Sequence, residues 1–140
     1  MRLTLSTTLT VIITVVVEPR SARAWCPEPK PSVRAESSAS DYVLTAVVTA
    51  ERLVPEAGKS YEGWSYRLKP IQIFRGRVHA ESEVFTENSS GRLPLEVGAQ
   101  YLLFAKRNGE GRLEITNCGH SGLAQQRVAE IAVLEKKRGK

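Results

Sequence analysis

The chain is poor in the residue types on which most catalytic and metal-binding sites depend. Its 140 residues include only two cysteines, two histidines and a single aspartate, Asp41. A nucleophile elbow, a glycine-rich phosphate loop, paired histidine ligands and an EF-hand loop are all missing from the sequence. We therefore expect a protein that acts by binding and not as an enzyme, without cofactor or resident metal. We interpret His79 and His120 as surface or loop residues.

The first 24 residues have the pattern of a secretory signal peptide. Arg2 precedes an apolar stretch from Leu3 to Val17, and small residues at Ala22 and Ala24 predict cleavage after Ala24. The alternative is an uncleaved anchor, but the stretch is shorter than the roughly 20 residues that span a bilayer as a helix. We expect residues 25–140 to form one secreted domain, extracellular, or periplasmic or on the cell surface if the source is bacterial, with no membrane span after cleavage.

Strong charge of one sign is also missing from the predicted mature chain. From Trp25 onward there are 17 Lys and Arg against 14 Asp and Glu, a net charge of +3. An exported protein with so little excess positive charge is not expected to bind nucleic acid.

A length of 140 residues, with 41% hydrophobic and 25% charged residues, is typical of a single globular domain. We expect a monomer.

The two cysteines, Cys26 and Cys118, lie far apart in the sequence. In an oxidising compartment, two thiols most simply form one disulfide. The alternative is a zinc site, but neither cysteine has a second ligand at metal spacing, because His120 follows Cys118 by only two residues. The predicted disulfide would tie the start of the mature chain to a point near the end of the predicted strands.

Five segments between the cysteines are rich in β-branched and aromatic residues or alternate in polarity, as strands do. Turn-forming residues predict a loop from Val54 to Glu62 and a hairpin at Asn108-Gly109, and Pro70 predicts a bulge or edge position. The predicted strands are Asp41–Thr49, Trp64–Lys69 continuing after Pro70 as Ile71–Phe74, Ser82–Thr86, Tyr101–Ala105 and Leu113–Thr116.

Two helical segments are expected beside the strands. A short polar stretch over residues 32–39 predicts a helical turn. Apolar residues from Leu123 to Leu134 repeat at the helical period, and Ser121 stands where a capping residue belongs. Five strands and a final helix, without an internal repeat, predict a mainly β fold in the form of a small closed or nearly closed barrel.

A series of short segments, in one order over nearly all of residues 25–135, carries a family resemblance. The segments are Cys26 with the prolines that follow it, Ser40–Val43, Ile73–Gly76, Gly98–Ala105, Leu113–Cys118 and Leu123–Ala124. Together they resemble the N-terminal domain of the tissue inhibitors of metalloproteinases. The resemblance implies the OB-fold of the netrin-like superfamily, a five-stranded Greek-key barrel with flanking helices, in a secreted protein.

The resemblance also implies a contact surface at the start of the mature chain. In that family the mature chain begins Cys-x-Cys, and the first cysteine chelates the zinc of the target protease through its α-amino nitrogen and carbonyl oxygen. Here Cys26 matches the second cysteine, Ala24 stands at the first, and Ser90-Gly91 replaces the Cys-Gly to which the first is bonded. We expect a zinc metalloproteinase or another secreted or surface protein as partner. The residues expected at the contact surface are Trp25, Cys26, Pro27, Ser89, Ser90 and Gly91.

A second class of function is an OB-fold module that binds an oligosaccharide, a peptide or the cell-envelope surface without inhibiting a protease. Trp64 and Tyr66 beside Arg67 or Arg75 would provide stacking and charge for such a ligand. The direction of the two aromatic side chains separates the alternatives. Outward rings would favour the module, and inward rings, with a free terminus next to the loop at Ser89–Gly91, would favour the inhibitor-like surface.

Overall fold

A computed structural model describes residues 26, 28–77 and 82–138 of the chain. Trp25 and Pro27 of the expected contact surface, His79 and the predicted signal peptide lie outside the described residues. The elements follow one another as α1 (Val33–Ala39), β1 (Tyr42–Glu56), β2 (Lys59–Arg75), β3 (Ser82–Glu87), β4 (Gln100–Arg107), β5 (Leu113–Glu114), β6 (Gly122–Leu123), a 3-10 turn (Ala124–Gln126) and α2 (Val128–Arg138).

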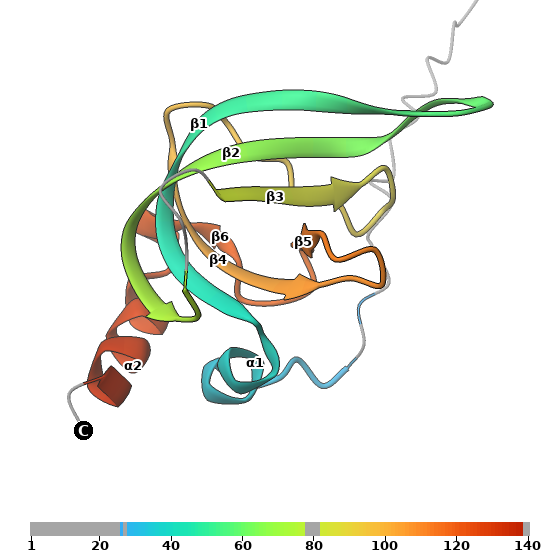
Figure 1. Ribbon diagram of the computed structural model, residues 1–140. Helices are drawn as coiled ribbons and strands as arrows, with labels where there is room; N and C mark the ends of the chain where they lie inside the picture. Colours follow the sequence, from blue (N-terminus) through green and yellow to red (C-terminus); the bar gives the residue numbers. More distant parts are fainter. Residues whose placement is uncertain (1–25, 27, 78–81, 139–140) are drawn as a thin grey trace, which may run out of the picture.

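Five strands close into a ring, and the fold is mainly β with a C-terminal helix, as predicted. β1 pairs with β2 and also with β4, so the order around the ring is β1-β2-β3-β5-β4 and back to β1. The pairings among the described strands are antiparallel except for β3 with β5, where Phe85 stands opposite Glu114. Figure 1 shows β1 and β2 as long curved strands that sweep around the other three.

The hairpin between β1 and β2 is much longer than predicted, and the loop expected from Val54 to Glu62 is wrong. Val54 pairs with Gly63 and Glu56 pairs with Lys59, which leaves only a two-residue turn at Ala57 and Gly58. Gly58 has a φ of +79°, a conformation that glycine adopts at little cost. Turn-forming residues suggested a loop here, but strand pairing continues almost to the tip and satisfies the backbone groups.

Pro70 lies at an irregularity in the middle of β2, which confirms the predicted bulge. Thr45 of β1 pairs with Gln72, and the next residue, Ala46, pairs with Pro70, so that Ile71 is left over. A proline without an N–H fits such a point because no ladder hydrogen bond has to be given up there. β2 therefore continues through the proline as one strand and bends around the ring.

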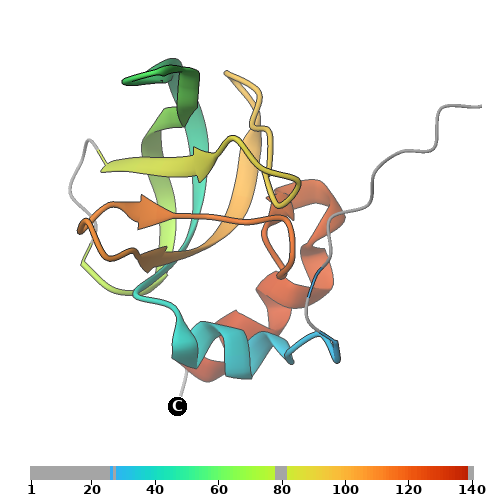
Figure 2. The same cartoon turned by 90° about the vertical axis from the view of Figure 1, so that its right-hand side faces the viewer.

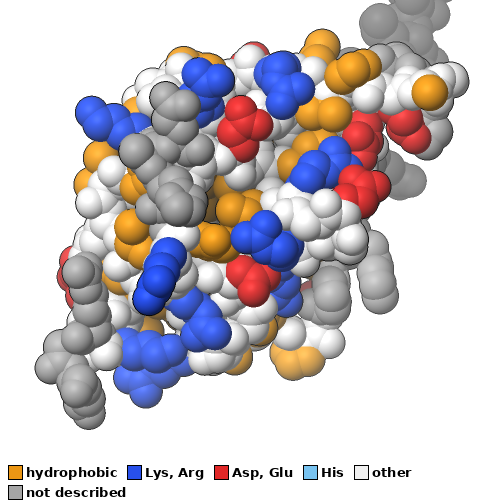
Figure 3. All heavy atoms as spheres, in the orientation of Figure 1, with side chains coloured by type: hydrophobic (Ala, Val, Ile, Leu, Met, Phe, Trp, Pro, Cys, Tyr) orange, Lys and Arg blue, Asp and Glu red, His pale blue; other side chains and the backbone are white. Residues whose placement is uncertain are grey.

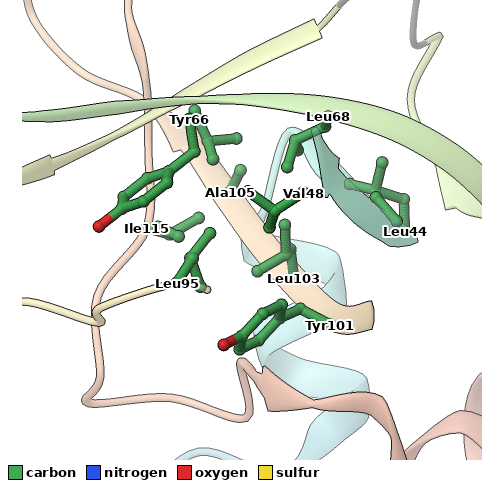
Figure 4. Close-up of a cluster of buried hydrophobic side chains, with 11 residues drawn as sticks. Leu44, Val48, Tyr66, Leu68, Leu95, Tyr101, Leu103, Ala105 and Ile115 are labelled. Atoms are coloured by element: carbon green, nitrogen blue, oxygen red, sulfur yellow. The ribbon is translucent and has the colours of Figure 1, made fainter. Parts of the chain in front are cut away.

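The interior of the ring is filled by large apolar side chains. Tyr66 and Leu68 of β2 and Leu103 of β4 are at most 1% exposed, and Figure 4 shows them converging with Tyr101 on a common centre. Burying each such side chain contributes about 1.5–3 kcal/mol to folding. The hydroxyl of Tyr101 accepts a hydrogen bond from the backbone N–H of Glu96 at 3.0 Å, so its polar end is satisfied.

The outer faces of β1 and β4 carry a second apolar cluster that the helices cover. Val43 and Phe104 are both at most 5% exposed, and they pack with Leu134 of α2 and with Val33 of α1. Figure 2 shows α1 and α2 lying together against the ring. The helical turn predicted over 32–39 is α1, and the Ser32 hydroxyl caps it by accepting from the backbone N–H of Ala35. The described residues include no helix long and apolar enough to cross a membrane.

The C-terminal helix begins later than predicted, at Val128, and Ser121 does not cap it. The Ser121 hydroxyl accepts a hydrogen bond from the backbone N–H of Phe104 at 2.9 Å, and Gly122–Leu123 pair with β4 as β6. Tyr101 and Leu102 of β4 pair with this segment. The need to satisfy these backbone groups therefore holds the segment in the sheet, although its apolar spacing suits a helix.

The last strand of the ring is shorter than the predicted Leu113–Thr116, because β5 ends at Glu114. The backbone N–H of Ile115 donates to the carbonyl of Phe85 at 3.0 Å, and the Ile115 side chain fills the ring interior. The chain then leaves β3 and continues toward Cys118.

Candidate functional site

The predicted disulfide is present and ties Cys26 to Cys118 across 92 positions. The sulfurs are 2.07 Å apart and the two Cα atoms 5.2 Å apart. A closed loop of this length stabilises a fold by about 4–5 kcal/mol in the chain-entropy model. Because each sulfur is bonded to the other, neither is available as a thiolate ligand, and the zinc alternative is wrong for this pair.

Asn117 joins the disulfide to the loop after β3. Its backbone N–H donates to the carbonyl of Gly91 at 2.9 Å, and its side-chain Nδ2 donates to the carbonyl of Ser90 at 3.3 Å. Its Oδ1 lies 3.6 Å from the sulfur of Cys118 and 3.9 Å from that of Cys26. Sequence analysis missed Asn117, although its position next to Cys118 was a usable signal. We call Cys26, Cys118, Asn117 and Ser89–Gly91 together the disulfide-loop ridge.

The loop of the ridge is also ordered by its own hydrogen bonds. The Ser89 hydroxyl accepts from the backbone N–H of Gly91 at 3.2 Å, and the Ser89 carbonyl accepts from the N–H of Arg92 at 3.1 Å. One residue earlier, the N–H of Asn88 donates to the carbonyl of Glu62 on β2 at 2.8 Å. Ser89 and Ser90 remain exposed, so the loop offers polar groups at the surface on a hydrogen-bonded backbone.

Arg92 anchors the end of this loop to the wall of the ring. Its guanidinium lies over the ring of Trp64, 3.2 Å from the centroid, and its Nη2 donates to the hydroxyl of Tyr66 at 3.3 Å. The Trp64 ring also packs edge-on against the Tyr61 ring, and the two ring centroids are 4.6 Å apart. A cation over a tryptophan face is worth about 0.5–1 kcal/mol at exposed sites and about 2 kcal/mol when it is desolvated, and Arg92 is half-buried. Arg92 is a second residue that sequence analysis missed.

Trp64 and Tyr66 do not form an outward platform for a ligand. Tyr66 is 0% exposed inside the ring, and Trp64 packs against the same core. Arg67 follows Tyr66 on β2 and has an exposed side chain, and Arg75 is exposed at the end of the strand. The strand therefore separates the aromatic rings from the charges that were expected to act beside them.

His120 lies in the loop after Cys118, as predicted, but its side chain is only 13% exposed. Its Nε2 is 2.8 Å from the carbonyl of Pro31, its backbone N–H donates to Glu36 Oε2 at 2.8 Å, and its Nδ1 is 3.5 Å from Glu130 Oε1. It therefore connects the N-terminal segment, α1 and α2.

Glu130, on α2, has a pKa that the surrounding donors shift. Burial acts to raise the pKa of Glu130, but its own backbone N–H, the His120 ring and the charge of Arg127 lower it below the usual range. Arg127 Nη1 lies 3.5 Å from the carboxylate. The carboxylate of Glu130 is therefore favoured in its ionised form at the helix end of this loop.

Two of the hollows on the described surface combine charged and apolar side chains. The larger, about 570 Å³, lies between the N-terminal segment, α1 and the end of β4, and it borders the ridge at Cys118. The smaller, about 290 Å³, lies between the β1–β2 hairpin, β3 and the β4–β5 turn. Figure 3 shows apolar side chains and side chains of both charges together on the face that carries β3 and β5. Among the described residues, no group of three or more His, Cys, Asp or Glu could hold a metal ion.

Comparison with known proteins adds no family to these observations. No protein-family model matches the chain, and a search of curated proteins finds no match. The geometry of the described residues therefore carries the functional argument.

Proposed function

We propose that this chain is an exported OB-fold domain similar to the N-terminal domain of the tissue inhibitors of metalloproteinases. It binds a zinc metalloproteinase or another secreted protein through the disulfide-loop ridge. The ring supports this assignment because β1 pairs with both β2 and β4 and β3 runs parallel to β5. A five-stranded Greek-key barrel with these neighbours is the arrangement expected of an OB-fold.

The observation that carries the proposal is the position of Asn117 between the disulfide and the loop. It brings Cys26, next to the predicted mature terminus, together with Ser90 and Gly91, although these residues are more than 60 positions apart. The inward side chains of Trp64 and Tyr66 favour the same surface over an aromatic binding face. A surface held by a disulfide and hydrogen bonds loses little conformational entropy on binding.

The chemistry that such a ridge would supply is a ligand for the partner's zinc. A catalytic zinc keeps one coordination position open, and a neutral α-amino group can occupy it. Cleavage after Ala24 would make Trp25 the first residue, one peptide bond from the disulfide at Cys26, which restricts the region its amine can reach. An α-amino group has a pKa of about 7.7–8.0, so the free amine needed for chelation is present near neutral pH.

Inhibition assays test the proposal directly. Residues 25–140, purified with the disulfide intact, are incubated with several zinc endopeptidases and a fluorogenic peptide substrate. We expect inhibition at micromolar concentration or below. It should be lost when one alanine is added before Trp25, which displaces the amine, and weakened at least tenfold by Ser90→Arg on the ridge. Lys69→Glu, an exposed change on β2, serves as the control. Absence of inhibition of every enzyme at about 10 μM rejects a zinc metalloproteinase as the partner.

The second candidate function is binding of an anionic oligosaccharide or peptide in the smaller hollow, without protease inhibition. Arg52, Arg107 and Arg112 line this hollow beside Phe85, and the Arg112 guanidinium lies 4.1 Å from the centre of the Phe85 ring. Glu83 pairs with Arg52 at 3.5 Å, and Glu62 and Glu110 pair with Arg112, so Arg107 is the cation of this hollow whose guanidinium has only neutral acceptors among the described residues. Arg107→Gln should weaken binding of a sulfated oligosaccharide measured by calorimetry, and absence of binding at low salt rejects this candidate.

A further inference from the structure

The larger hollow is a groove that continues from the ridge. The side chains of Pro29 and Pro31 line one side, Phe104 lies in it with 5% of its surface exposed, and Lys106 and Arg107 line another part. Cys118 belongs both to the groove and to the ridge. We call this hollow the Phe104 groove. Its volume of about 570 Å³ lies within the range of sites that bind small ligands or short peptide segments.

The two carboxylates in the groove are already engaged within the protein. Glu36 accepts a hydrogen bond from the backbone N–H of His120 at 2.8 Å and lies 4.0 Å from its ring nitrogen. Burial, and then repulsion from Glu87, raise the pKa of Glu114, while a hydrogen bond from Asn108 and the charge of Arg112 act against this shift. These surroundings make either carboxylate a poor partner for an additional cation.

The side chains of the two cations at the groove, Lys106 and Arg107, are not bound to a carboxylate among the described residues. Lys106 is exposed, and within the described part of the chain its ammonium group makes no ion pair or side-chain hydrogen bond. The Arg107 guanidinium donates to the carbonyl of Gly111 at 2.7 Å and to the hydroxyl of Tyr42 at 3.3 Å, and both of these acceptors are neutral. Glu114 stands opposite Lys106 on β5 without forming an ion pair with it, and the Asp41 carboxylate accepts from the backbone N–H of Arg107 at 2.7 Å. The groove therefore has an apolar surface and, at the end of β4, an ammonium group that is unpaired within the described part of the chain.

We propose that the Phe104 groove binds an extended peptide segment of the partner, with an apolar side chain against Phe104 and Pro31 and a carboxylate at Lys106. The proposal rests on the proposed function, because continuity with the ridge at Cys118 is what makes the occupant part of the same partner. The apolar side chain gains burial against the groove, and the carboxylate forms a charge-assisted contact with an ammonium group that makes no ion pair within the described part of the chain. The groove would then distinguish partners by the amino-acid sequence of the segment that binds in it, while the ridge makes the same contact with every partner.

Two matched peptides and NMR titration test this assignment. The probes are acetyl-Ala-Phe-Glu-Leu-Ala-amide and the same peptide with lysine in place of glutamate, added to ¹⁵N-labelled residues 25–140. We expect the acidic peptide to shift the backbone amides of Phe104, Lys106 and Gly119 and to bind at least tenfold more tightly than the basic one. Lys106→Glu should reverse this preference, and Lys69→Glu on β2 should leave it unchanged. Thermal unfolding of both variants shows whether the fold is intact.

Each outcome bears on the groove separately from the ridge. Equal affinity for both peptides, shifts elsewhere on the protein, or binding unaffected by Lys106→Glu overturns the groove assignment. Absence of shifts at millimolar peptide does the same. Protease inhibition without peptide binding leaves the ridge in place and rejects the groove. Peptide binding at the groove without inhibition of any zinc endopeptidase supports the groove as a peptide site and rejects metalloproteinases as the partner class.

Discussion

The loop from Asn117 to Ser121 is held on its two sides by different chemistry. On the ridge side, Cys118 is bonded to Cys26 and Asn117 donates to carbonyls of the loop after β3. On the helix side, carboxylates of α1 and α2 meet the backbone and ring of His120. The ridge side is covalent and otherwise made of neutral groups, whereas the helix side depends on ionised carboxylates. The same loop should therefore respond to reduction on one side and to acid on the other.

The difference explains why the ridge is the better candidate for a binding surface. Its position does not depend on the protonation of a side chain, and Arg92 fixes the far end of its loop on Trp64. The helix side instead attaches α1 and α2 to the ring, and its polar groups are turned toward one another. Four predictions, in order of decreasing effect, separate the two sides.

Removing the disulfide should have the largest effect. The double variant Cys26→Ser/Cys118→Ser releases a constraint on 92 positions, and we expect it to lose about 4 kcal/mol in the free energy of unfolding. Guanidinium denaturation of the variant and the parent gives this difference. A loss below about 1 kcal/mol would mean that Asn117 and the helix side hold the terminus without the covalent bond.

Arg92→Met should have the next largest effect, because it removes the cation over Trp64 and the hydrogen bond to Tyr66. We expect a loss of about 2 kcal/mol in unfolding free energy. In a Trp25→Phe background, the fluorescence of Trp64 should also change. Arg67→Met, on an exposed position of the same wall, is the matched control and should stay within about 0.5 kcal/mol of the parent. Equal effects of the two substitutions would mean that Arg92 does not anchor the loop of the ridge.

Asn117→Ala should act locally. It keeps the backbone bond to Gly91 and deletes the side-chain bond to Ser90, which is worth about 1 kcal/mol. Amide hydrogen exchange should become faster at Gly91 and Arg92 and stay unchanged in α2. If exchange rises equally in α2, the two sides of the loop are not independent, and the comparison between them fails.

Glu130→Gln should show the smallest effect, confined to the helix side and dependent on pH. The pKa of Glu130 lies below its usual value in the folded state, so its ionised form stabilises the fold above the unfolded pKa of about 4.3. That contribution is lost as the pH falls through the folded pKa. We expect Glu130→Gln to be less stable than the parent at pH 7, and the difference should shrink as the pH falls below the unfolded pKa and vanish below the folded pKa. Thermal unfolding between pH 7 and pH 3 measures it, with exposed Glu51→Gln as the control. A difference that stays constant with pH contradicts the assignment.

Much of the strand content could be predicted because period-two alternation and β-branched residues report directly on a half-buried strand. The segments at Val43–Val48 and Tyr101–Ala105 are buried as their composition suggests, and Pro70 marks an irregularity that its missing N–H requires. The end of β1 and the start of α2 could not be predicted in this way. Pro55 and Gly58 suggest a loop and Leu123 suggests a helix, but pairing with a neighbouring strand decides both positions.

The candidate site was predictable in its parts but not in its assembly. Two cysteines in a chain with a signal-peptide pattern predict a disulfide, and the position of Ser90-Gly91 follows from the family resemblance. Asn117 and Arg92 carry no motif, since an asparagine beside a cysteine or an arginine after a glycine occurs in many loops. Their roles depend on which backbone carbonyls and aromatic rings the ring of strands places beside them.

By itself, the sequence determined where the five strands of the ring have their centres and which two sulfurs are joined, because these follow from local side-chain chemistry and from there being only two cysteines. Only the tertiary structure decided that Tyr66 points inward and that Asn117 lies between the disulfide and the Ser89–Gly91 loop. It also placed an exposed Lys106 at the edge of an apolar groove. These features depend on closure of the ring, which brings together residues far apart in the chain, and a local pattern contains no information about such contacts.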